Sequence, residues 1–326
     1  MTKNNDFDKL TKLADLNELN YNQAENTQIA YSKDWKDFEK FCKKYNRKDL
    51  PAEYDTIRNY LVFLSGGQKK IYKLNTIKRR LASIAAKHKE LNHTFNSSHP
   101  IIKRQMDSIK RNLKNNLEQT SPLLFDDLKK IIDEIDKEIS QNGFKKINYR
   151  DKAIILIGWF GAFRRSELVN LEYENIALTE NGLIIKMNKS KTDQEGKLEP
   201  KGLERSSNKN SPYCPYYNYL IWINESKISS GKIFRHIDTS NSINHESLSD
   251  KAIALIIKNR ALKAGIPNEK LSGHSFRAGF ATELAKKGAT ESEIMKTTQH
   301  KSADMVRRYI RDAEILKTAA KKYIKF

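Results

Sequence analysis

The sequence contains little cysteine and no long apolar run, and each absence excludes a class of protein. Two cysteines among 326 residues, Cys42 and Cys214, supply neither the disulfide framework of a small secreted domain nor a Cys-x-x-Cys zinc pattern. No apolar stretch approaches the roughly 20 residues that a membrane-spanning helix needs. The first residues, MTKNNDFDKL, lack the apolar core of a secretory signal. We therefore expect a cytoplasmic protein.

Histidine is also scarce, and its spacing argues against a metal centre. The seven histidines are scattered along the chain, and no two of them form a His-x-x-x-His pair, which would place both imidazoles on one helical face. The sequence therefore predicts no metal site, and nothing in it calls for another cofactor.

Positive charge, by contrast, is in excess. The chain has 60 lysines and arginines against 40 acidic residues, a net charge of +20. This balance indicates a polyanionic partner, although a lysine-rich coding bias would also explain it. The distribution favours a partner, because 13 basic and only two acidic residues lie between Lys69 and Lys114, and such patches contact phosphate backbones. The candidate DNA-binding residues of this stretch are Lys78, Arg79, Arg80, Lys103, Arg104, Lys110 and Arg111.

Helical periodicity dominates the N-terminal third of the chain. Residues 1–22 show no strong period, and we predict a flexible arm there. Within residues 23–114, apolar positions recur at three- and four-residue steps and predict four helices, the second with Pro51 in its first turn. In the third of these helices the apolar residues are expected to point inward and the basic residues 78–80 outward. The segment therefore predicts a small all-α module.

The second half is predicted to be a separate domain of mixed structure. A polar segment with a Ser-Pro step, residues 115–124, is typical of a linker. In residues 125–326 most segments have helical periodicity, while an alternating stretch that turns near residues 193–196 predicts a β-hairpin. The last residues predict a C-terminal helix. The expected fold class is therefore mainly α: a four-helix module followed by an α+β domain with a small β-sheet or hairpin.

Four segments of the second half hold side chains suited to a phosphate group. They contribute Arg164 with Glu167, Lys191, His274 with Arg277, and His300 with Tyr309. Each has an ordinary structural explanation when taken alone, because arginines close helices, exposed lysines are solvated and tyrosines are often half-buried. The surroundings of Tyr309 are less ordinary, since Arg307, Arg308 and Arg311 flank it. We expect this helix to lie against DNA, with Arg308 or Arg311 anchoring a phosphate.

Taken in this order, the four segments resemble the tyrosine recombinase (phage integrase) family, which includes Cre and the Xer recombinases. The family box GLRxSEL corresponds to AFRRSEL here, which places its arginine at Arg164. The box H-x-x-R is complete as His274 and Arg277, and the histidine expected nine residues before the nucleophile is His300, which assigns the nucleophile to Tyr309. The hairpin SKTDQEG is similar to that of many phage-type integrases.

The resemblance extends over roughly residues 25–325 and leaves some assignments open. Gln299 stands where a glycine often precedes the histidine of the third box, a change that removes no catalytic group. Arg165 lies beside Arg164. Lys189 lies two residues before Lys191, and both would point to the same face of an extended strand. The match to the SKT step favours Lys191.

The resemblance implies a site-specific DNA recombinase that cleaves and rejoins strands through a covalent 3′-phosphotyrosine. Two arginines, Arg164 and Arg277, would stabilise the charge that builds on the phosphate in the pentacoordinate transition state. The Tyr309 hydroxyl would attack the phosphorus, and because a phenol has a pKa near ~10, His274 is expected to help remove its proton.

The remaining residues have supporting roles in this scheme. His300 would donate a hydrogen bond to a phosphate oxygen, Lys191 would protonate the leaving 5′ oxygen, and Glu167 would orient neighbouring side chains. The implied catalytic set is Arg164, Lys191, His274, Arg277, His300 and Tyr309. The scheme needs neither ATP nor a divalent metal. The family also implies that the two halves clamp double-stranded DNA, that four chains assemble on two recombination sites, and that the C-terminal helix docks on a neighbouring protomer.

Two other functions stay open at this point. A type IB topoisomerase shares the same chemistry but relaxes supercoils as a monomer, and the integrase-like N-terminal module argues against it. A DNA-binding protein that has lost catalysis is the second alternative. The presence of every expected catalytic residue type argues against this one.

Overall fold

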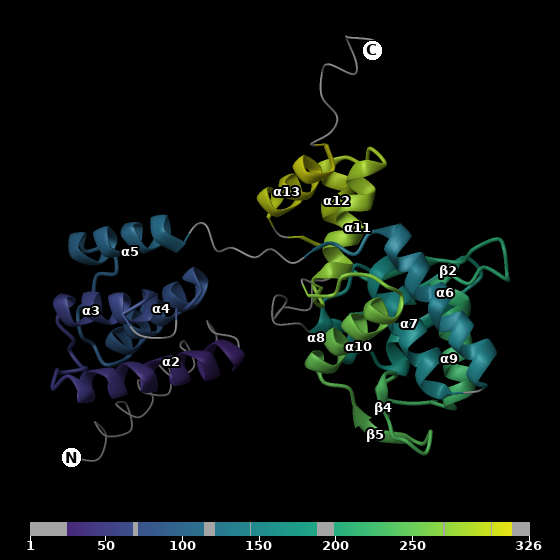
Figure 1. The fold of residues 1–326 in the computed structure, drawn as a ribbon, viewed down its shortest axis with the longest axis horizontal. Helices are drawn as coiled ribbons and strands as arrows, with labels where there is room; N and C mark the ends of the chain where they lie inside the picture. The colour runs from purple at the N-terminus through teal and green to yellow at the C-terminus, as the bar shows by residue number, and fades with distance from the viewer. Residues whose placement is uncertain are drawn as a thin grey trace, which may run out of the picture. The chain divides into compact units, whose positions relative to one another are not determined.

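The computed structural model divides the chain into two compact units, Met1–Glu118 and Gln119–Phe326 (Figure 1). The structure describes residues 25–67, 71–113, 121–143, 145–187, 199–269, 271–300 and 302–314. The predicted arm and the last residues of the predicted C-terminal helix lie outside these ranges. The division falls inside the segment predicted to be the linker, and the assignment of the units to DNA binding and to catalysis stays a prediction.

The described residues of the N-terminal unit form four helices around one apolar core. These are α2 (Glu25–Lys44), α3 (Tyr54–Ser65), α4 (Leu74–Glu90) and α5 (Pro100–Leu113). Their apolar faces meet as the spacing predicted, and the rings of Phe38 and Tyr60 pack 5.0 Å apart at the centre. One boundary was predicted wrongly: α3 begins at Tyr54 behind the extended Glu53, so Pro51 lies in the preceding turn and outside the helix.

Arg80 corrects the prediction that all three basic residues of α4 face outward. The Arg80 side chain is only 8% exposed, and its guanidinium donates to Tyr60 Oη at 2.7 Å and to Asp37 Oδ2 at 2.6 Å. Position 80 falls on the same helical face as the core residue Ile77, because residues three apart are neighbours on a helix. Arg80 therefore joins α4 to α2 and α3 and is not an exposed DNA-binding residue.

The other six candidate DNA-binding residues of this unit differ in how free they are to bind a partner. Lys78 is exposed on α4, and the basic residues of α5 are exposed as well: Lys103, Arg104, Lys110 and Arg111. Arg79 is half-exposed, but it donates twice to the buried Asp34 on α2, at 2.7 and 3.0 Å. Its charge is thus largely neutralised within the unit.

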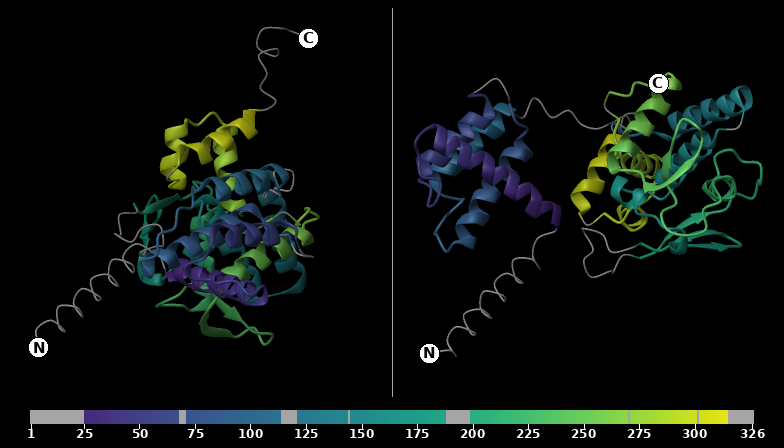
Figure 2. Two further views of the ribbon diagram at one scale, coloured as in Figure 1. Left: turned by 90° about the vertical axis from the view of Figure 1, so that its left-hand side faces the viewer. Right: turned by 90° about the horizontal axis from the view of Figure 1, so that it is seen from below.

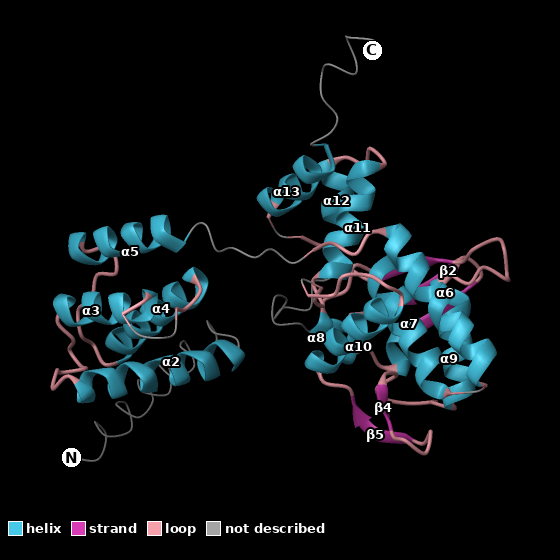
Figure 3. Cartoon of the chain, viewed as in Figure 1, coloured by secondary structure: helices cyan, strands magenta, loops and turns pink. Residues whose placement is uncertain are grey.

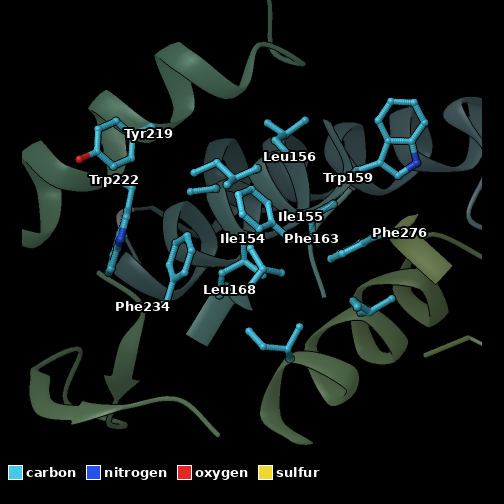
Figure 4. Packing of buried hydrophobic residues seen from close by; sticks show 14 of the residues in the cluster. Ile154, Ile155, Leu156, Trp159, Phe163, Leu168, Tyr219, Trp222, Phe234 and Phe276 are labelled. Atoms are coloured by element: carbon cyan, nitrogen blue, oxygen red, sulfur yellow. The ribbon is translucent and has the colours of Figure 1, made fainter. Parts of the chain in front are cut away.

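The second unit is built around the apolar helix α7 (Lys146–Phe160). Around α7 pack α6 (Phe125–Asn142), α9 (Pro215–Ser226), α10 (Asp250–Lys263) and α11 (Ser275–Lys286). Figure 4 shows aromatic side chains from several of these elements, among them Trp222, Phe163 and Phe276, gathered around Ile154 and Ile155 of α7. Helix α7 is buried along most of its length.

The described part of the second unit also contains two small antiparallel sheets (Figure 3). The first has the order β1 (Ile176–Thr179), β2 (Gly182–Ile185) and β3 (Lys201–Glu204), with Ile185 opposite Lys201. It confirms a small β-structure here, while the turn expected at residues 193–196 lies outside the described residues. The second sheet, β4 (Arg235–Ile237) with β5 (Ile243–Ser247), was not predicted. Most of β5 is exposed, so it has no apolar alternation to detect.

A short helical subassembly closes the second unit. Helices α12 (Glu291–Thr298) and α13 (Ala303–Glu314) lie beside α11 in all the views of Figures 1 and 2. The contact is apolar, formed by the buried Ala281, Ile294 and Val306 with partly buried neighbours. This packing brings α13, which carries Tyr309, onto the helix that carries Arg277. Across the described residues, no helix is long and apolar enough to span a membrane.

The buried position of Arg80 generates a stability prediction. Replacing Arg80 with methionine keeps most of the apolar volume but leaves Tyr60 and Asp37 without their cation. We expect the N-terminal unit to lose about 2 kcal/mol, because a hydrogen bond to a charged group contributes roughly 1.5–3 kcal/mol. Amide hydrogen exchange in α2 and α4 measures this local free energy. Lys78→Gln is the matched control on the exposed face and should change it by less than about 0.5 kcal/mol. Equal effects of the two substitutions would contradict the assignment.

Candidate active site

The site begins at the turn that ends α7. Gly161 follows the helix, and Ala162 adopts φ 46°, a left-handed conformation that costs a non-glycine residue roughly 1–2 kcal/mol. Arg164 then stands at the start of the short helix α8 (Arg165–Val169). Its backbone amide donates to Glu167 Oε2 at 2.8 Å, and its guanidinium donates to Glu167 Oε1. Since Glu167 is 5% exposed, a buried carboxylate holds both the backbone and the side chain of Arg164.

Arg277 is a deeply buried cation. It is 4% exposed on the first turn of α11, and its Nη1 donates to the backbone oxygen of Ala162 at 3.2 Å. Its Nη2 is buried and has no hydrogen-bond partner among the described residues. Burial, reinforced by the nearby Arg164, lowers the pKa of Arg277 to about 10. A buried guanidinium with an unused donor is suited to an anionic oxygen, because a charge-assisted bond would satisfy it.

His274 stands immediately before α11 and is the more exposed partner of Arg277. Removal of its ring from water lowers the pKa of His274, and the guanidiniums of Arg165, Arg164 and Arg277 lower it further. The imidazole is therefore neutral at physiological pH. A neutral imidazole can accept a proton, which is the role that the sequence predicted for it.

His300 is locked between Arg277 and Thr298. Arg277 Nε donates to His300 Nε2 at 3.1 Å, and His300 Nδ1 lies 2.6 Å from Thr298 Oγ1. The hydroxyl of Thr298 donates in turn to the backbone oxygen of Ile294, so its oxygen must accept from His300. The ring is thus the neutral tautomer with its proton on Nδ1. Burial, with the charges of Arg277 and Arg164, lowers the pKa of His300 to about 3.

This geometry changes the role predicted for His300. The sequence predicted that His300 donates to a phosphate oxygen, but its one donor, Nδ1–H, is directed to Thr298, and its Nε2 accepts from Arg277. His300 therefore orients the guanidinium of Arg277. The residue before it, Gln299, adopts φ 55°, which explains why a glycine suits this position, and its amide donates to the backbone oxygen of Glu199 at 2.8 Å.

Tyr309 lies close to both of these residues. Its ring centroid is 5.8 Å from that of His300, and its electrostatic interaction with Arg277 opposes the lowering of that guanidinium's pKa. Arg308 and Arg311 are exposed on the same helix, whereas Arg307 pairs with Glu291 at 2.9 Å. The structure thus brings Tyr309, His300, Arg277 and Arg164 into one region of the second unit.

The structure adds a buried lysine that the sequence reasoning missed. Lys201, at the start of β3, is 5% exposed, and its Nζ donates to the backbone oxygen of Gly161 at 2.6 Å. A signal was present in the sequence, because strand alternation places Lys201 on the same face as the buried Leu203. The two lysines singled out from the sequence, Lys189 and Lys191, lie outside the described residues.

The assembled side chains form a strongly cationic site with a single buried carboxylate. Arg164, Arg277 and Lys201 each carry positive charge within electrostatic reach of one another, and Glu167 opposes them. Such an arrangement favours a ligand with negative charge, and a phosphodiester fits because its two non-bridging oxygens accept several donors. Within the described part of the chain, no cluster of three or more His, Cys, Asp or Glu residues could hold a metal ion.

Comparison with known protein sequences gives concordant matches. Residues 121–314 match the family described as Phage integrase family. An integrase/recombinase XerD homolog from Selenomonas ruminantium is 36% identical over 313 residues, which cover 93% of this chain and 86% of the relative. Tyrosine recombinase XerD of Rickettsia bellii is 24% identical and covers 85% of this chain and 85% of its own length.

Solved structures share the fold at low sequence identity. The Tn1549 transposon integrase in complex with transposon right end DNA has a TM-score of 0.62 and 14% identity, over 94% of this chain and 98% of that chain. The XerH site-specific recombinase bound to palindromic difH substrate, a post-cleavage complex, has a TM-score of 0.60 and 18% identity, over 83% and 72% of the two chains. The mainly α fold with small antiparallel sheets is thereby confirmed.

The lock on His300 can be tested by its protonation state. Imidazole ¹⁵N spectra should show the neutral Nδ1–H tautomer of His300 throughout the range from about pH 4 to pH 8, because its pKa is about 3. Thr298→Val removes the acceptor and should shift these resonances. Thr297→Val is the matched control, since Thr297 makes the same kind of bond to the helix backbone but faces solvent. Titration of wild-type His300 near its ordinary pKa would contradict the lock.

Proposed function

This chain belongs to the tyrosine recombinase (phage integrase) family, and we propose that it recombines DNA site-specifically through a covalent 3′-phosphotyrosine on Tyr309. Membership makes it a tyrosine site-specific recombinase, and the proposal concerns its chemistry and the residues that perform it. The observation that supports this chemistry best is the buried Arg277, whose Nη2 has no partner among the described residues and which lies within electrostatic reach of Arg164 and Tyr309.

The two arginines bind the scissile phosphate in this proposal. Arg277 offers Nη2 to one non-bridging oxygen, while its Nε and Nη1 stay fixed on His300 and the Ala162 backbone. Arg164, which is 26% exposed and held by Glu167, binds the phosphate beside it. The protein holds both guanidiniums before the substrate arrives, so less of the reorganisation that water would need opposes the stabilisation of the charge that grows on the phosphate.

Two proton transfers accompany strand cleavage in this proposal. The Tyr309 oxygen attacks phosphorus while its proton passes to His274, whose pKa is lowered and whose ring is neutral. The bond from phosphorus to the 5′ oxygen breaks, and that oxygen takes a proton from Lys191. The products are a 3′-phosphotyrosine and a 5′-hydroxyl. A 5′-hydroxyl from a second strand reverses the sequence, so neither ATP nor a divalent metal enters the reaction.

The basic surface of the N-terminal unit supplies sequence-independent affinity for DNA. The exposed residues Lys78, Lys103 and Arg104 are proposed to contact phosphates, as are Lys110 and Arg111 on the next turns of α5. Arg308 and Arg311 are exposed beside Tyr309 and contribute in the second unit. The similar Tn1549 integrase and XerH structures contain DNA, which supports double-stranded DNA as the partner. Four chains on two sites, joined through the C-terminal segment, complete the proposal.

The nucleophile is tested by Tyr309→Phe, which removes one oxygen and keeps the ring. We expect DNA binding at the wild-type level and no covalent adduct on a denaturing gel, because no attacking oxygen remains. Tyr217→Phe is the matched control, a half-buried phenol that donates to the Ser206 backbone away from the site. The assay contains EDTA, so wild-type adduct there also supports a metal-independent reaction. Covalent adduct from Tyr309→Phe would refute the assignment.

The same assay separates the alternatives. A DNA-binding protein without catalysis forms no adduct even as wild type. A topoisomerase forms an adduct and relaxes supercoils but does not exchange strands between two sites, so recombination of a two-site plasmid distinguishes it from a recombinase.

The proton donor is tested with DNA whose scissile 5′ oxygen is replaced by sulfur, a leaving group that needs little protonation. On ordinary DNA, Lys191→Ala should cleave more slowly by ~10²–10⁴, the contribution of a positioned proton donor. On the sulfur substrate it should cleave at close to the wild-type rate, whereas Arg277→Ala should stay defective. Rescue of Lys189→Ala in its place would exchange the two lysines. Rescue of neither would assign the proton to another group.

A further inference from the structure

We propose that Lys201 is a positioning residue of the recombination site: it fixes the turn of residues 161–163 and thereby holds Arg164 against the scissile phosphate. The inference rests on the proposed function and adds a lysine that is distinct from the proton donor. It concerns a residue in β3, whereas the predicted proton donor precedes that strand.

Burial makes a partner for Lys201 obligatory. Its side chain lies on the covered face of β3 together with Leu203, and the residue is only 5% exposed. A lysine is rarely buried unless its ammonium is bound, because desolvation of the charge is unfavourable. The ammonium meets the turn at two points: Nζ donates to the Gly161 oxygen at 2.6 Å and lies 5.1 Å from the centre of the Phe163 ring.

The turn that Lys201 binds combines a close contact at Gly161 with an unusual backbone conformation at Ala162. A Cβ at Gly161 would lie 2.2 Å from a Phe163 ring atom, so any side chain there would displace the ring that Lys201 contacts. Ala162 is left-handed at φ 46°, a conformation that L-residues seldom adopt. Such a turn persists only when its surroundings hold it in place.

Two cations from different elements provide that support. Lys201, from β3, binds the oxygen of Gly161, and Arg277, from α11, binds the oxygen of Ala162, the next carbonyl along the chain. Arg164 follows two residues later. The position of the Arg164 backbone, and with it the direction of its side chain, therefore depends on both contacts. In the proposal, Lys201 affects the phosphate only indirectly, through Arg164.

Neighbouring charges act on the pKa of Lys201 in opposite directions. Glu167 on α8 favours the charged ammonium, whereas Arg277 and Arg164 oppose it. His300 is neutral at physiological pH. Burial is the largest influence and lowers the pKa of Lys201 to about 8. Below that pH the bond to Gly161 is charge-assisted, and above it the bond is weaker. The hold on the turn should therefore weaken as pH rises through about 8.

The experiment measures single-turnover cleavage by full-length Lys201→Met, which keeps the length of the side chain but not its ammonium. At pH 7 we expect cleavage to slow by about 10²-fold, the effect of misplacing a group by about 1 Å, with DNA affinity unchanged. The loss should be equal on ordinary and 5′-sulfur DNA. The loss should shrink above about pH 8, because the wild-type enzyme then also loses the charge of Lys201.

Lys232→Met is the matched control. Lys232 donates to the Asn170 oxygen at 3.2 Å, and removal of its ammonium should leave the cleavage rate within about twofold of wild type.

Three results would overturn the proposal. Rescue of Lys201→Met by the sulfur substrate would make Lys201 the proton donor itself. If the ratio of the wild-type to the Lys201→Met cleavage rate stays constant with pH, Lys201 has only a general structural role. If Lys201→Met cleaves at the wild-type rate, Lys201 has no role in the site. If circular dichroism shows that Lys201→Met is unfolded, Lys201→Gln takes its place in the same measurements. Failure of the proposed function is distinguishable, because it shows as missing wild-type adduct or as adduct with Tyr309→Phe.

Discussion

The candidate active site depends on one electrostatic constraint: among the described residues, three cations gather around one buried carboxylate, Glu167. Arg164, Arg277 and Lys201 repel one another, and Glu167 compensates only part of that charge. Proteins tolerate such an arrangement where a ligand completes it. In the proposed function a phosphate of the DNA supplies the missing counter-charge, and the same excess of positive charge stabilises the more negative transition state.

The excess charge also explains the state of the neighbouring imidazoles. Positive surroundings and burial lower the pKa of both His274 and His300, so both are neutral at physiological pH. The neutral ring has a different consequence in each of the two histidines. His274 can take up a proton, whereas His300, bonded to Arg277 and Thr298, fixes the direction of a guanidinium. Two residues of one type thus have different functions because their hydrogen-bond partners differ.

In the N-terminal unit, too, residues of one charge on a single helix have different surroundings. Adjacent residues of α4 are basic, yet Lys78 is exposed while Arg80 is buried against Tyr60 and Asp37. Counting positive residues along the sequence does not separate the two, because a turn of 3.6 residues assigns each position to a different face. The net charge available to a partner is therefore smaller than the composition suggests.

The sequence by itself determined the fold class, the apolar faces of the N-terminal helices and the family, because apolar periodicity and the order and spacing of motif residues are local properties. It placed Arg277, His300 and Tyr309 in a common site, and the structure brings them together. Only the tertiary structure decided which atom each residue faces. The accepting nitrogen of His300, the burial of Arg80 and the contact of Lys201 with Gly161 all join segments that are far apart in the chain or turn on a side-chain direction. Such contacts depend on packing between elements, which periodicity along one element does not encode.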